Sequence, residues 1–353
     1  MNILIVKLSA IGDVVHTLPA LMRLRQHYPD AHITWLVEAA AAPLLLNHMA
    51  LDRVLVSRRK TWLRQLRSSA TRKQALRGIR VFLKTLRDTR YDVVLDFQGL
   101  LKSGMLIALC RGKRKIGFGR GMEHQEHSYH FLNERIPAVS MEIHALVRNL
   151  KMLGPLGIPA VEQGAVEYGL PVKEEDRKRA AALINRAKDG HRYVAALNPM
   201  AKWDTKLWTA DKFARLADML IEWHDTAVVF TGSREDEAAI EEIRLLMDHS
   251  ALNIAGQTGL LELAAVYEQV DVVVTTDTGP MHIAAAVNAP VVTIFGPTAP
   301  WRTGPFGNNN RIVRTGIDCS PCFKRDCRTR ECMAAISVDQ VLTAVRELRP
   351  DMR

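Results

Sequence analysis

A glycine and a carboxylate follow the first apolar run of the chain, in the sequence Lys7-Leu-Ser-Ala-Ile-Gly12-Asp13. Gly12 would permit close backbone approach, and Asp13 falls at the start of a predicted helix, where a negative charge is favoured. A role as a helix cap would equally explain Asp13. The turn has neither a GxGxxG nor a GxxxxGK[ST] pattern, which argues against a dinucleotide-binding or P-loop site here.

A second strand-to-helix turn spans Thr276–His282 and carries an aspartate, two threonines, a glycine and a proline. The proline fits the first turn of a helix, where a missing N–H is not needed. Thr278, Gly279 and the free backbone amides of Met281 and His282 would then form an anion site at the positive end of the helix dipole. An ordinary strand-to-helix turn is the alternative, but this combination of residue types favours a ligand site.

Two further strand ends carry charged residues. Lys202 and Lys206 could serve as point charges for a phosphate, whereas the nearby Trp203 and Trp208 are expected in the core rather than as stacking surfaces. Asp236 follows the next predicted strand and could bind ribose hydroxyls. A favourable charge at a helix N-terminus would explain Asp236 as well.

Four of the five cysteines lie close together, with the spacing C-x2-C-x4-C-x4-C. In a reducing compartment this spacing indicates a metal site, and four thiolates suit a closed structural zinc or iron site rather than a catalytic one. Unligated thiols are the alternative. The residues concerned are Cys319, Cys322, Cys327 and Cys332.

Strands and helices that could position these residues alternate along the chain. The predicted strands are Asn2–Lys7, Ile33–Val37, Arg53–Val56, Asp92–Phe97, Tyr193–Asn198, Thr226–Thr231, Val272–Thr276 and Val291–Phe295. The predicted helices are Val14–Tyr28, Lys73–Arg90, Leu100–Leu109, Glu142–Leu153, Lys173–Lys188, Ala210–Glu222, Glu235–Met247, Leu260–Glu268, one starting near Pro280 and one from Ser337, where Gln340 completes a capping box.

This alternation predicts an α/β protein with two doubly wound parallel-sheet domains that face a cleft. Residues 111–140 are expected to be irregular, because they are rich in glycine, arginine and histidine. The glycine- and proline-rich stretch 154–172 is expected to be a linker. We therefore expect domains at residues 1–160 and 173–335, followed by a C-terminal helix at 336–353.

Composition and charge restrict the class of protein. Of the 353 residues, 48% are hydrophobic and 24% charged, as in a globular protein with a sizeable core. No apolar run reaches the ~20 residues of a spanning helix, and the N-terminus does not resemble a signal peptide, so a cytoplasmic location is expected. The net charge of +10 is concentrated between Arg53 and Arg90, and such a field attracts nucleic acid, an anionic membrane or an anionic substrate.

The motifs as a set resemble glycosyltransferase family 9, the bacterial lipopolysaccharide heptosyltransferases, and most of all its heptosyltransferase I branch. The resemblance spans nearly the whole chain. It is carried by Val6–Leu21, by Asp96-Phe-Gln-Gly-Leu-Leu-Lys-Ser103, by Lys206-Leu-Trp208, by Gly232-Ser233, and by Thr276–His282 with Phe295-Gly-Pro-Thr298.

The resemblance implies a GT-B fold and an inverting transfer of L-glycero-D-manno-heptose from ADP-heptose to Kdo of the lipopolysaccharide inner core, with no cofactor for catalysis. Asp13 would be the general base on the acceptor hydroxyl, and Lys206 would neutralise the diphosphate. Asp236 would lie on the ribose and Thr258 beside the adenine. The full set of expected donor-binding residues is Gly12, Lys206, Asp236, Thr258, Asp277, Thr278, Gly279, Met281 and His282.

The resemblance also gives the basic segment a partner, the anionic Kdo-lipid A acceptor at the cytoplasmic face of the inner membrane, where the enzyme would be peripheral. The expected acceptor-binding residues are Arg59, Lys60, Trp62, Lys102 and Arg120. A family 9 relative that adds a later heptose or another sugar is the alternative, and a GT-B sugar-nucleotide epimerase is a weaker one. Nucleic acid is not expected, because the basic run has almost no interleaved aromatic residues and no recognition fold.

Overall fold

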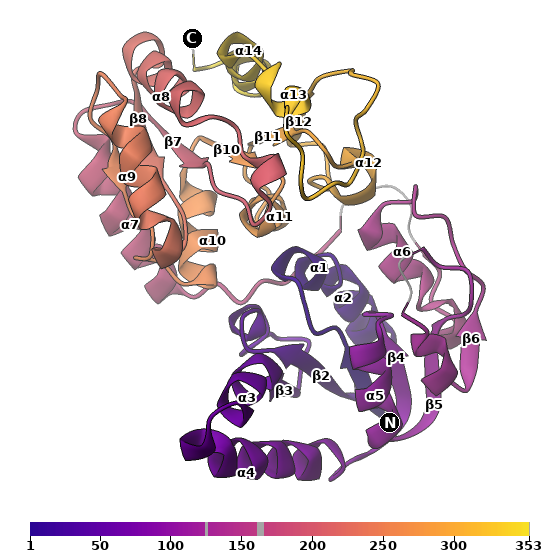
Figure 1. Cartoon of the computed structure of the whole chain (residues 1–353). Helices are drawn as coiled ribbons and strands as arrows, with labels where there is room; N and C mark the ends of the chain where they lie inside the picture. The colour runs from indigo at the N-terminus through magenta and orange to yellow at the C-terminus, as the bar shows by residue number, and fades with distance from the viewer. Residues whose placement is uncertain (124–125, 161–165, 353) are drawn as a thin grey trace. The chain divides into compact units, whose positions relative to one another are not determined.

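The computed structural model of the chain describes residues 1–123, 126–160 and 166–352. Residues 124–125 of the predicted irregular segment and 161–165 of the predicted linker lie outside the described residues. The chain divides into two compact units, unit 1 at Met1–Pro171 and unit 2 at Val172–Arg353 (Figure 1). Each unit is described by itself.

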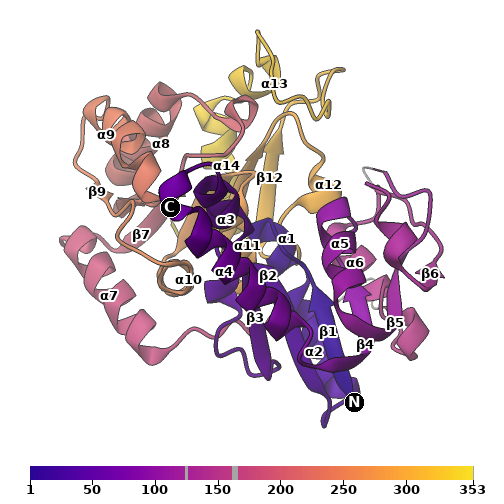
Figure 2. The same cartoon turned by 60° about the horizontal axis from the view of Figure 1, so that its bottom comes forward.

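Unit 1 is built on a six-stranded, fully parallel sheet with the order β3-β2-β1-β4-β5-β6, and its strands follow one another in that order across Figure 2. The central strands are continuous apolar runs, because helices cover a parallel sheet on both faces. The strands are β1 (Asn2–Val6), β2 (His32–Glu38), β3 (Arg53–Ser57), β4 (Arg90–Asp96), β5 (Arg111–Phe118) and β6 (Glu134–Ile136).

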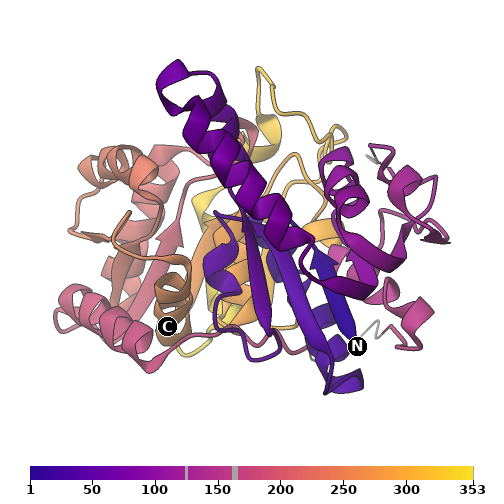
Figure 3. The same ribbon diagram turned by 90° about the horizontal axis from the view of Figure 1, so that it is seen from below.

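Among the described residues, unit 1 has six α-helices. They are α1 (Ile11–Val15), α2 (Leu18–His27), α3 (Arg59–Leu66), α4 (Ser69–Leu86), α5 (Leu101–Leu109) and α6 (Ala145–Lys151), and the next helix, α7 (Glu174–Lys188), opens unit 2. The long helix α4 runs across a face of the sheet in Figure 3. Its Phe82 and Leu86 are buried in one cluster with Leu36 of β2 and Leu55 of β3, so α4 is held by an apolar face on the sheet.

Unit 2 has a second six-stranded parallel sheet, with the order β12-β11-β10-β7-β8-β9. Its strands are β7 (Tyr193–Asn198), β8 (Thr226–Phe230), β9 (Leu252–Asn253), β10 (Val272–Thr276), β11 (Val291–Phe295) and β12 (Asn310–Arg314). The remaining helices are α8 (Ala210–His224), α9 (Glu237–Leu245), α10 (Leu260–Gln269), α11 (Gly279–Ala286), α12 (Pro300–Thr303), α13 (Glu331–Ala334) and α14 (Val338–Leu348). At the start of α14, the predicted capping box is confirmed, since Ser337 Oγ accepts a hydrogen bond from Gln340 N at 3.2 Å.

Three sequence predictions need correction. Residues 111–140 are not irregular throughout, because they contain β5 and β6. The strand β5 was missed because its first half is rich in basic residues, which suit a half-exposed strand near a sheet edge. The predicted helix Val14–Tyr28 is two helices that meet at Thr17. Helix α3 and the edge strand β12 were missed, because α3 buries none of its residues and β12 buries little.

The two sheets share one topology. Each places its first and fourth strands side by side, which makes β1 and β4 the switch point of unit 1, and β7 and β10 the switch point of unit 2. In doubly wound sheets, ligands bind at the carboxyl ends of the strands at this point. The fold thus directs attention to the residues after Val6 and Asp96 in unit 1, and after Asn198 and Thr276 in unit 2. In the part of the chain that the structure describes, no helix combines the length and hydropathy needed to span a membrane.

Candidate active site

The switch point of unit 1 holds a pocket with a volume of about 270 Å³. Asp13 lines it from the turn after β1, while Asp96 and Gln98 line it from the end of β4. The other lining residues are Lys7, Phe97, Gly99, Leu100, Phe118, Met122, Glu123, Met141, Ala145, Arg148 and Asn149. The pocket therefore combines carboxylates, cations and amides in the place where this topology binds ligands.

Asp13 caps a helix and also lines the pocket. It lies in the first turn of α1, and its Oδ2 accepts a hydrogen bond from Ala10 N at 3.0 Å. Its side chain is half-buried, whereas the neighbouring Gly12 is buried. The two explanations that the sequence left open are thus compatible, because a capping bond to one carboxylate oxygen fixes the direction of the group without removing it from the pocket.

The loops after β1 and β4 are joined by side-chain hydrogen bonds. Gln98 Oε1 accepts from Leu8 N at 2.9 Å and from Ser9 N at 3.0 Å. The ammonium of Lys102 donates to Ser9 Oγ at 2.7 Å, and the buried Lys7 donates to the Phe97 carbonyl at 3.0 Å. These bonds hold the Asp13 turn in a fixed position relative to the end of β4.

Three of the predicted acceptor-binding cations converge on one buried carboxylate, Glu38 at the end of β2. Its oxygens lie 3.2 Å from Arg59 Nη2, 3.8 Å from Lys102 Nζ and 4.0 Å from Lys60 Nζ. Only 7% of the Glu38 side chain is exposed, against 70% for Lys60. Burial lowers the pKa of Lys102, although Glu38 opposes this effect. One carboxylate shared among three cations leaves an excess of positive charge, as an anion-binding site needs.

The other two predicted acceptor residues lie outside this group. The Trp62 ring packs against Phe82, 5.3 Å between ring centroids, and it covers Gly78, where an added Cβ would meet Trp62 Nε1 at 2.7 Å. The ring therefore fastens α3 to α4. Arg120 is exposed in the loop after β5, and it is not one of the cations that meet at Glu38.

At the switch point of unit 2, Lys206 forms an ion pair with Asp277. The Lys206 Nζ lies 2.5 Å from Asp277 Oδ2, and the side chains are 15% and 7% exposed. Asp277 Oδ2 also accepts a hydrogen bond from Thr298 Oγ1 at 2.6 Å, and the Lys206 ammonium lies over the Trp203 ring, 4.5 Å from its centroid. The lysine predicted to neutralise a diphosphate is thus held next to the aspartate of the turn after β10.

The turn after β10 has the predicted strand-to-helix form. Thr278 is the N-cap residue of α11 in extended backbone, Gly279 begins the helix, and a proline occupies the first turn. Met281 and His282 are both buried. The first turn of α11 therefore lies at the carboxyl end of β10, beside the Lys206–Asp277 pair.

The predicted ribose and adenine residues lie in two adjoining loops. Asp236 Oδ2 accepts hydrogen bonds from Ser233 N at 2.8 Å and Ser233 Oγ at 2.7 Å, so the helix-terminal role considered for Asp236 is present. The Gly256 N–H donates to the Gly232 carbonyl at 3.0 Å, which joins this loop to the one that carries the half-buried Thr258.

The structure does not support the predicted metal site at the four clustered cysteines. Among the described residues, no three His, Cys, Asp or Glu side chains lie together as ligands of one ion. Cys319 is exposed, Cys322 and Cys327 are half-buried, and Cys332 is buried. Burial raises the pKa of the Cys332 thiol, and the neighbouring thiols of Cys322, Cys319 and Cys327 raise it further, so the four side chains lie near one another.

Sequence reasoning did not single out Glu38, Lys7 or Asp96 as site residues. All three lie within one residue of the carboxyl end of a central strand of unit 1. A search for polar residues at the end of every predicted strand would have found them, because the topology brings these ends to one edge. Glu38 was hidden by its position just past an apolar run.

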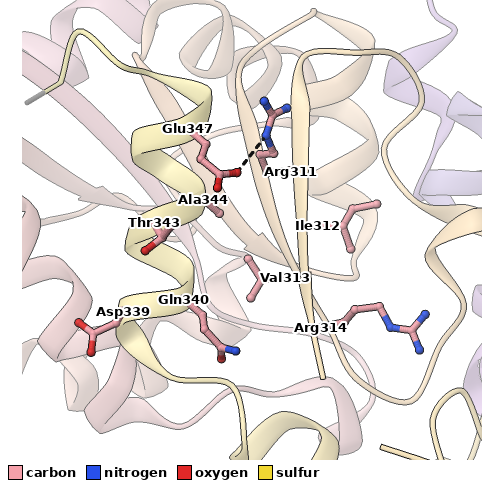
Figure 4. Close-up of a pocket in the computed structure, with 9 residues that line it drawn as sticks. All are labelled: Arg311, Ile312, Val313, Arg314, Asp339, Gln340, Thr343, Ala344 and Glu347. Atoms are coloured by element: carbon pink, nitrogen blue, oxygen red, sulfur yellow. Dashed lines mark ion pairs between the residues drawn. The ribbon is translucent and has the colours of Figure 1, made fainter. Parts of the chain in front are cut away.

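A second depression, of about 390 Å³, lies between the edge strand β12 and α14 in unit 2. Figure 4 shows the ion pair between Arg311 and Glu347 across it, with 3.5 Å between Arg311 Nε and Glu347 Oε2. It lies at the edge of the sheet, away from the switch point between β7 and β10, and it contains none of the predicted site residues.

Comparison with known proteins gives the same family as the motifs. The profile of glycosyltransferase family 9 (heptosyltransferase) matches residues 79–333. The chain is 29% identical to lipopolysaccharide heptosyltransferase 1 of Pseudomonas aeruginosa over 93% of this chain and 87% of that protein. It is 26% identical to lipopolysaccharide heptosyltransferase 3 of Escherichia coli K12, over 96% of each.

The fold is shared with a solved structure, "E. coli heptosyltransferase WaaC with ADP", at a TM-score of 0.78 and 24% identity, over 99% of this chain and 100% of that one. The predicted fold class, GT-B with two doubly wound parallel sheets, is therefore confirmed. Because the family profile covers most of the chain, and both curated relatives are heptosyltransferases, the chain belongs to glycosyltransferase family 9, the heptosyltransferases, and is a glycosyltransferase.

Proposed function

We propose that this enzyme transfers L-glycero-D-manno-heptose from ADP-heptose to Kdo of the lipopolysaccharide inner core, with inversion at the anomeric carbon. The observation that carries this proposal is the arrangement in unit 1. There Asp13 lines a pocket, and cations at the neighbouring strand end, collected by Glu38, could pair with the carboxylate of a sugar acid. The lipopolysaccharide heptosyltransferase 1 relative supports the same acceptor class.

In this proposal, residues 1–160 bind the acceptor. Asp13 accepts the proton of the attacking hydroxyl as the new glycosidic bond forms, because its carboxyl group lines the pocket and is held there by the hydrogen bond from Ala10 N. Arg59, Lys60 and Lys102 bind the Kdo carboxylate, with Arg120 further along the same acceptor. No cofactor takes part in this step.

Residues 173–335 bind ADP-heptose, and the C-terminal helix at 336–353 completes that domain. Lys206 and the amides of the α11 N-terminus neutralise the diphosphate, whose charge grows as the sugar leaves. Without the donor, Lys206 is paired with Asp277. We propose that donor binding breaks this ion pair and that the Lys206 ammonium then pairs with the diphosphate. Asp236 contacts the ribose and Thr258 the adenine.

We place the enzyme peripherally on the cytoplasmic face of the inner membrane, held there by α3 and α4. The sequence from Arg53 to Arg87 contains no acidic residue. Opposite its buried face, α4 has an exposed basic stripe at spacings of three and four residues, Lys73, Arg77, Arg80 and Lys84. Exposed Leu76 and Val81 flank the stripe, a pattern that suits an anionic bilayer surface.

Membrane binding is tested with vesicles of phosphatidylglycerol and of phosphatidylcholine. The four stripe residues changed to Gln should abolish sedimentation with the anionic vesicles, whereas the same change at Lys173, Lys178, Arg186 and Lys188, which are exposed in unit 2, should not. Equal binding by both variants would remove α4 as the membrane contact. A preference for duplex DNA over anionic vesicles at physiological salt would favour nucleic acid instead.

The transfer itself is tested by incubating the purified protein with ADP-heptose and Kdo-lipid A and weighing the lipid product. A single heptose increment on the Kdo acceptor supports the proposal. Activity only on an acceptor that already carries heptose would assign the enzyme to a later step, which the relative named heptosyltransferase 3 makes the main alternative. An epimer formed from the donor alone would indicate an epimerase.

A further inference from the structure

One loop of unit 2 that the proposed function does not use lies against the loops around Lys206. It is the cysteine segment, residues 315–330, which joins β12 to α13. Its Cys322 N and Phe323 N donate hydrogen bonds to the Pro297 carbonyl at 3.0 and 2.8 Å. The segment is therefore fastened to the loop after β11.

The cysteine segment also contacts the loop after β7, which carries Lys206. The buried Thr205 donates a hydrogen bond from Oγ1 to the Lys324 carbonyl at 2.9 Å. The Arg325 guanidinium lies over the Trp203 ring, with Cζ 4.7 Å from the ring centroid. Lys206 belongs to the same short turn, since its N–H donates to the Trp203 carbonyl at 2.9 Å. The segment thus holds the turn of Lys206 at two points.

The Trp203 ring is shared by two cations. Lys206 Nζ lies 4.5 Å from the ring centroid, and Arg325 Cζ lies 4.7 Å from it. The sequence predicted both tryptophans of this loop in the core, but Trp203 is only half-buried, whereas Trp208 is 4% exposed. The Trp203 ring is therefore a surface for cations rather than a core side chain.

A ring face differs from a carboxylate as a partner for an ammonium. The ring attracts the cation through its quadrupole but carries no net charge, so the ammonium keeps its charge for another anion. Asp277, with Oδ2 at 2.5 Å from Lys206 Nζ, neutralises the same ammonium. When Lys206 leaves Asp277 for an anion, the ring can therefore continue to hold it.

We infer that Arg325 is a positioning residue for Lys206 and that it acts through the Trp203 ring. A guanidinium over an aromatic face restricts rotation of the ring, and the ring in turn keeps the Lys206 ammonium in place for the diphosphate. The inference rests on the proposed function in taking the ligand of Lys206 to be the diphosphate of the donor. It gives the cysteine segment a role in the donor site.

ADP is the probe, because it carries the diphosphate and its binding depends neither on turnover nor on the acceptor. Arg325→Gln removes the charge and should bind ADP about fivefold more weakly than the wild-type protein, the effect of losing one cation–ring contact. Arg325→Lys keeps a cation that can lie over the ring and should stay within about twofold of the wild-type affinity. Arg328→Gln is the matched control, since Arg328 is exposed in the same segment, and it should leave ADP affinity unchanged.

The same change is then made in a Trp203→Leu background. Because Arg325 acts through the ring, Arg325→Gln should have no further effect on ADP affinity once the ring is absent. In the transfer assay, Arg325→Gln should raise the KM for the donor and leave the KM for the acceptor unchanged. A general loss of structure would change both KM values.

Affinities are measured by isothermal titration calorimetry. Three outcomes would overturn the inference: unchanged ADP affinity in Arg325→Gln, equal losses in Arg325→Gln and Arg328→Gln, or an undiminished loss in the Trp203→Leu background, which would mean that Arg325 contacts the nucleotide itself. Failure of the proposed function looks different, since the proteins would then bind ADP in the expected pattern while the wild-type protein transferred no heptose to Kdo-lipid A.

Discussion

The two units have the same strand order, but the same location in each carries different chemistry. After β1 and β4, unit 1 has a pocket lined by Asp13 and Asp96, and at the end of β2 three cations share Glu38. After β7 and β10, unit 2 has Lys206 and Asp277 joined at 2.5 Å. Topology therefore sets where a ligand binds. The pairing of side chains sets what charge the ligand meets, which is an excess of cations in unit 1 and a lysine already paired with an aspartate in unit 2.

The largest effect should come from the base of unit 1. Asp13→Asn should lower kcat by about 10² to 10⁴, as the loss of a general base does, while ADP-heptose binding stays within a few-fold. Steady-state kinetics and calorimetric titration of the donor measure the two quantities. Near-normal kcat would reduce Asp13 to a helix cap and would leave the unit 1 pocket without a base.

The next effect should come from unit 2. Lys206→Ala should weaken ADP-heptose binding and slow transfer. It should also lower stability by about 3–5 kcal/mol, because the buried Asp277 loses its cation. The double variant with Asp277→Asn should regain most of the stability but not the donor affinity.

That double variant separates the two roles of the lysine, with stability followed by denaturant unfolding. Thr278→Ala should likewise weaken donor binding. A change confined to the acceptor KM in either single variant would show that the unit 2 switch point does not serve the donor.

Removing the carboxylate that collects the cations should have a smaller effect. Glu38→Gln should raise the acceptor KM several-fold and leave the donor KM unchanged, because Arg59 and Lys102 lose the group that fixes their positions. Glu134→Gln is the matched control, since Glu134 pairs with Arg114 at 2.8 Å outside the pocket. Equal effects of the two changes would mean that Glu38 has no special place in acceptor binding.

Asp96→Asn should increase stability at neutral pH. Because burial raises the pKa of Asp96 in the folded state, the native protein binds more protons than the unfolded chain between the unfolded and folded pKa values. The stability of the wild-type protein therefore falls as pH rises through that window. The asparagine variant lacks this penalty, so its Tm should exceed that of the wild-type protein at pH 7 by a few degrees.

Below the pKa of an unfolded aspartate, the two Tm values should converge, since both proteins are then neutral at this position. Calorimetric scans across pH test this expectation. A lower Tm for the variant at pH 7 would mean that Lys7 compensates the Asp96 charge fully.

Chelation should have the smallest effect. Because the described residues hold no three ligands for one ion, a strong chelator should shift the Tm by less than about 1 °C, and elemental analysis should find well under one equivalent of zinc or iron. A large fall in Tm, with loss of order confined to residues 315–335, would show instead that the four cysteines do assemble around a metal.

Much of the fold could be predicted from the sequence, because its core strands are apolar runs between turn residues. Three strands have the predicted bounds, namely Tyr193–Asn198, Val272–Thr276 and Val291–Phe295. The capping box at Ser337 predicted the start of α14, because a capping box is a local sequence pattern. Elements at the rim were missed, because β5 and α3 are basic and at most partly buried over much of their length, so their apolar periodicity is weak.

Within the site, local motifs located Asp13 and the turn from Thr276 to His282. The pairing of Lys206 with Asp277, and the convergence of Arg59 and Lys102 on Glu38, depend on contacts between residues far apart in the sequence. The spacing of residues within a motif cannot predict such contacts, because each contact joins two motifs that meet only after folding. For the four cysteines, the spacing predicts a metal site that the structure does not support, because no three ligand side chains among the described residues are placed to hold one ion.

The carboxamide of Gln98 has a consequence for motion. Because its oxygen accepts from both Leu8 N and Ser9 N, the loop after β1 cannot open without breaking bonds to the loop after β4. The amide protons of residues 8 and 9 should therefore exchange slowly with solvent, on the timescale of local unfolding rather than of loop fluctuation. The two loops should move as one body, so Asp13 would meet each acceptor already in position, without a separate ordering step before every turnover.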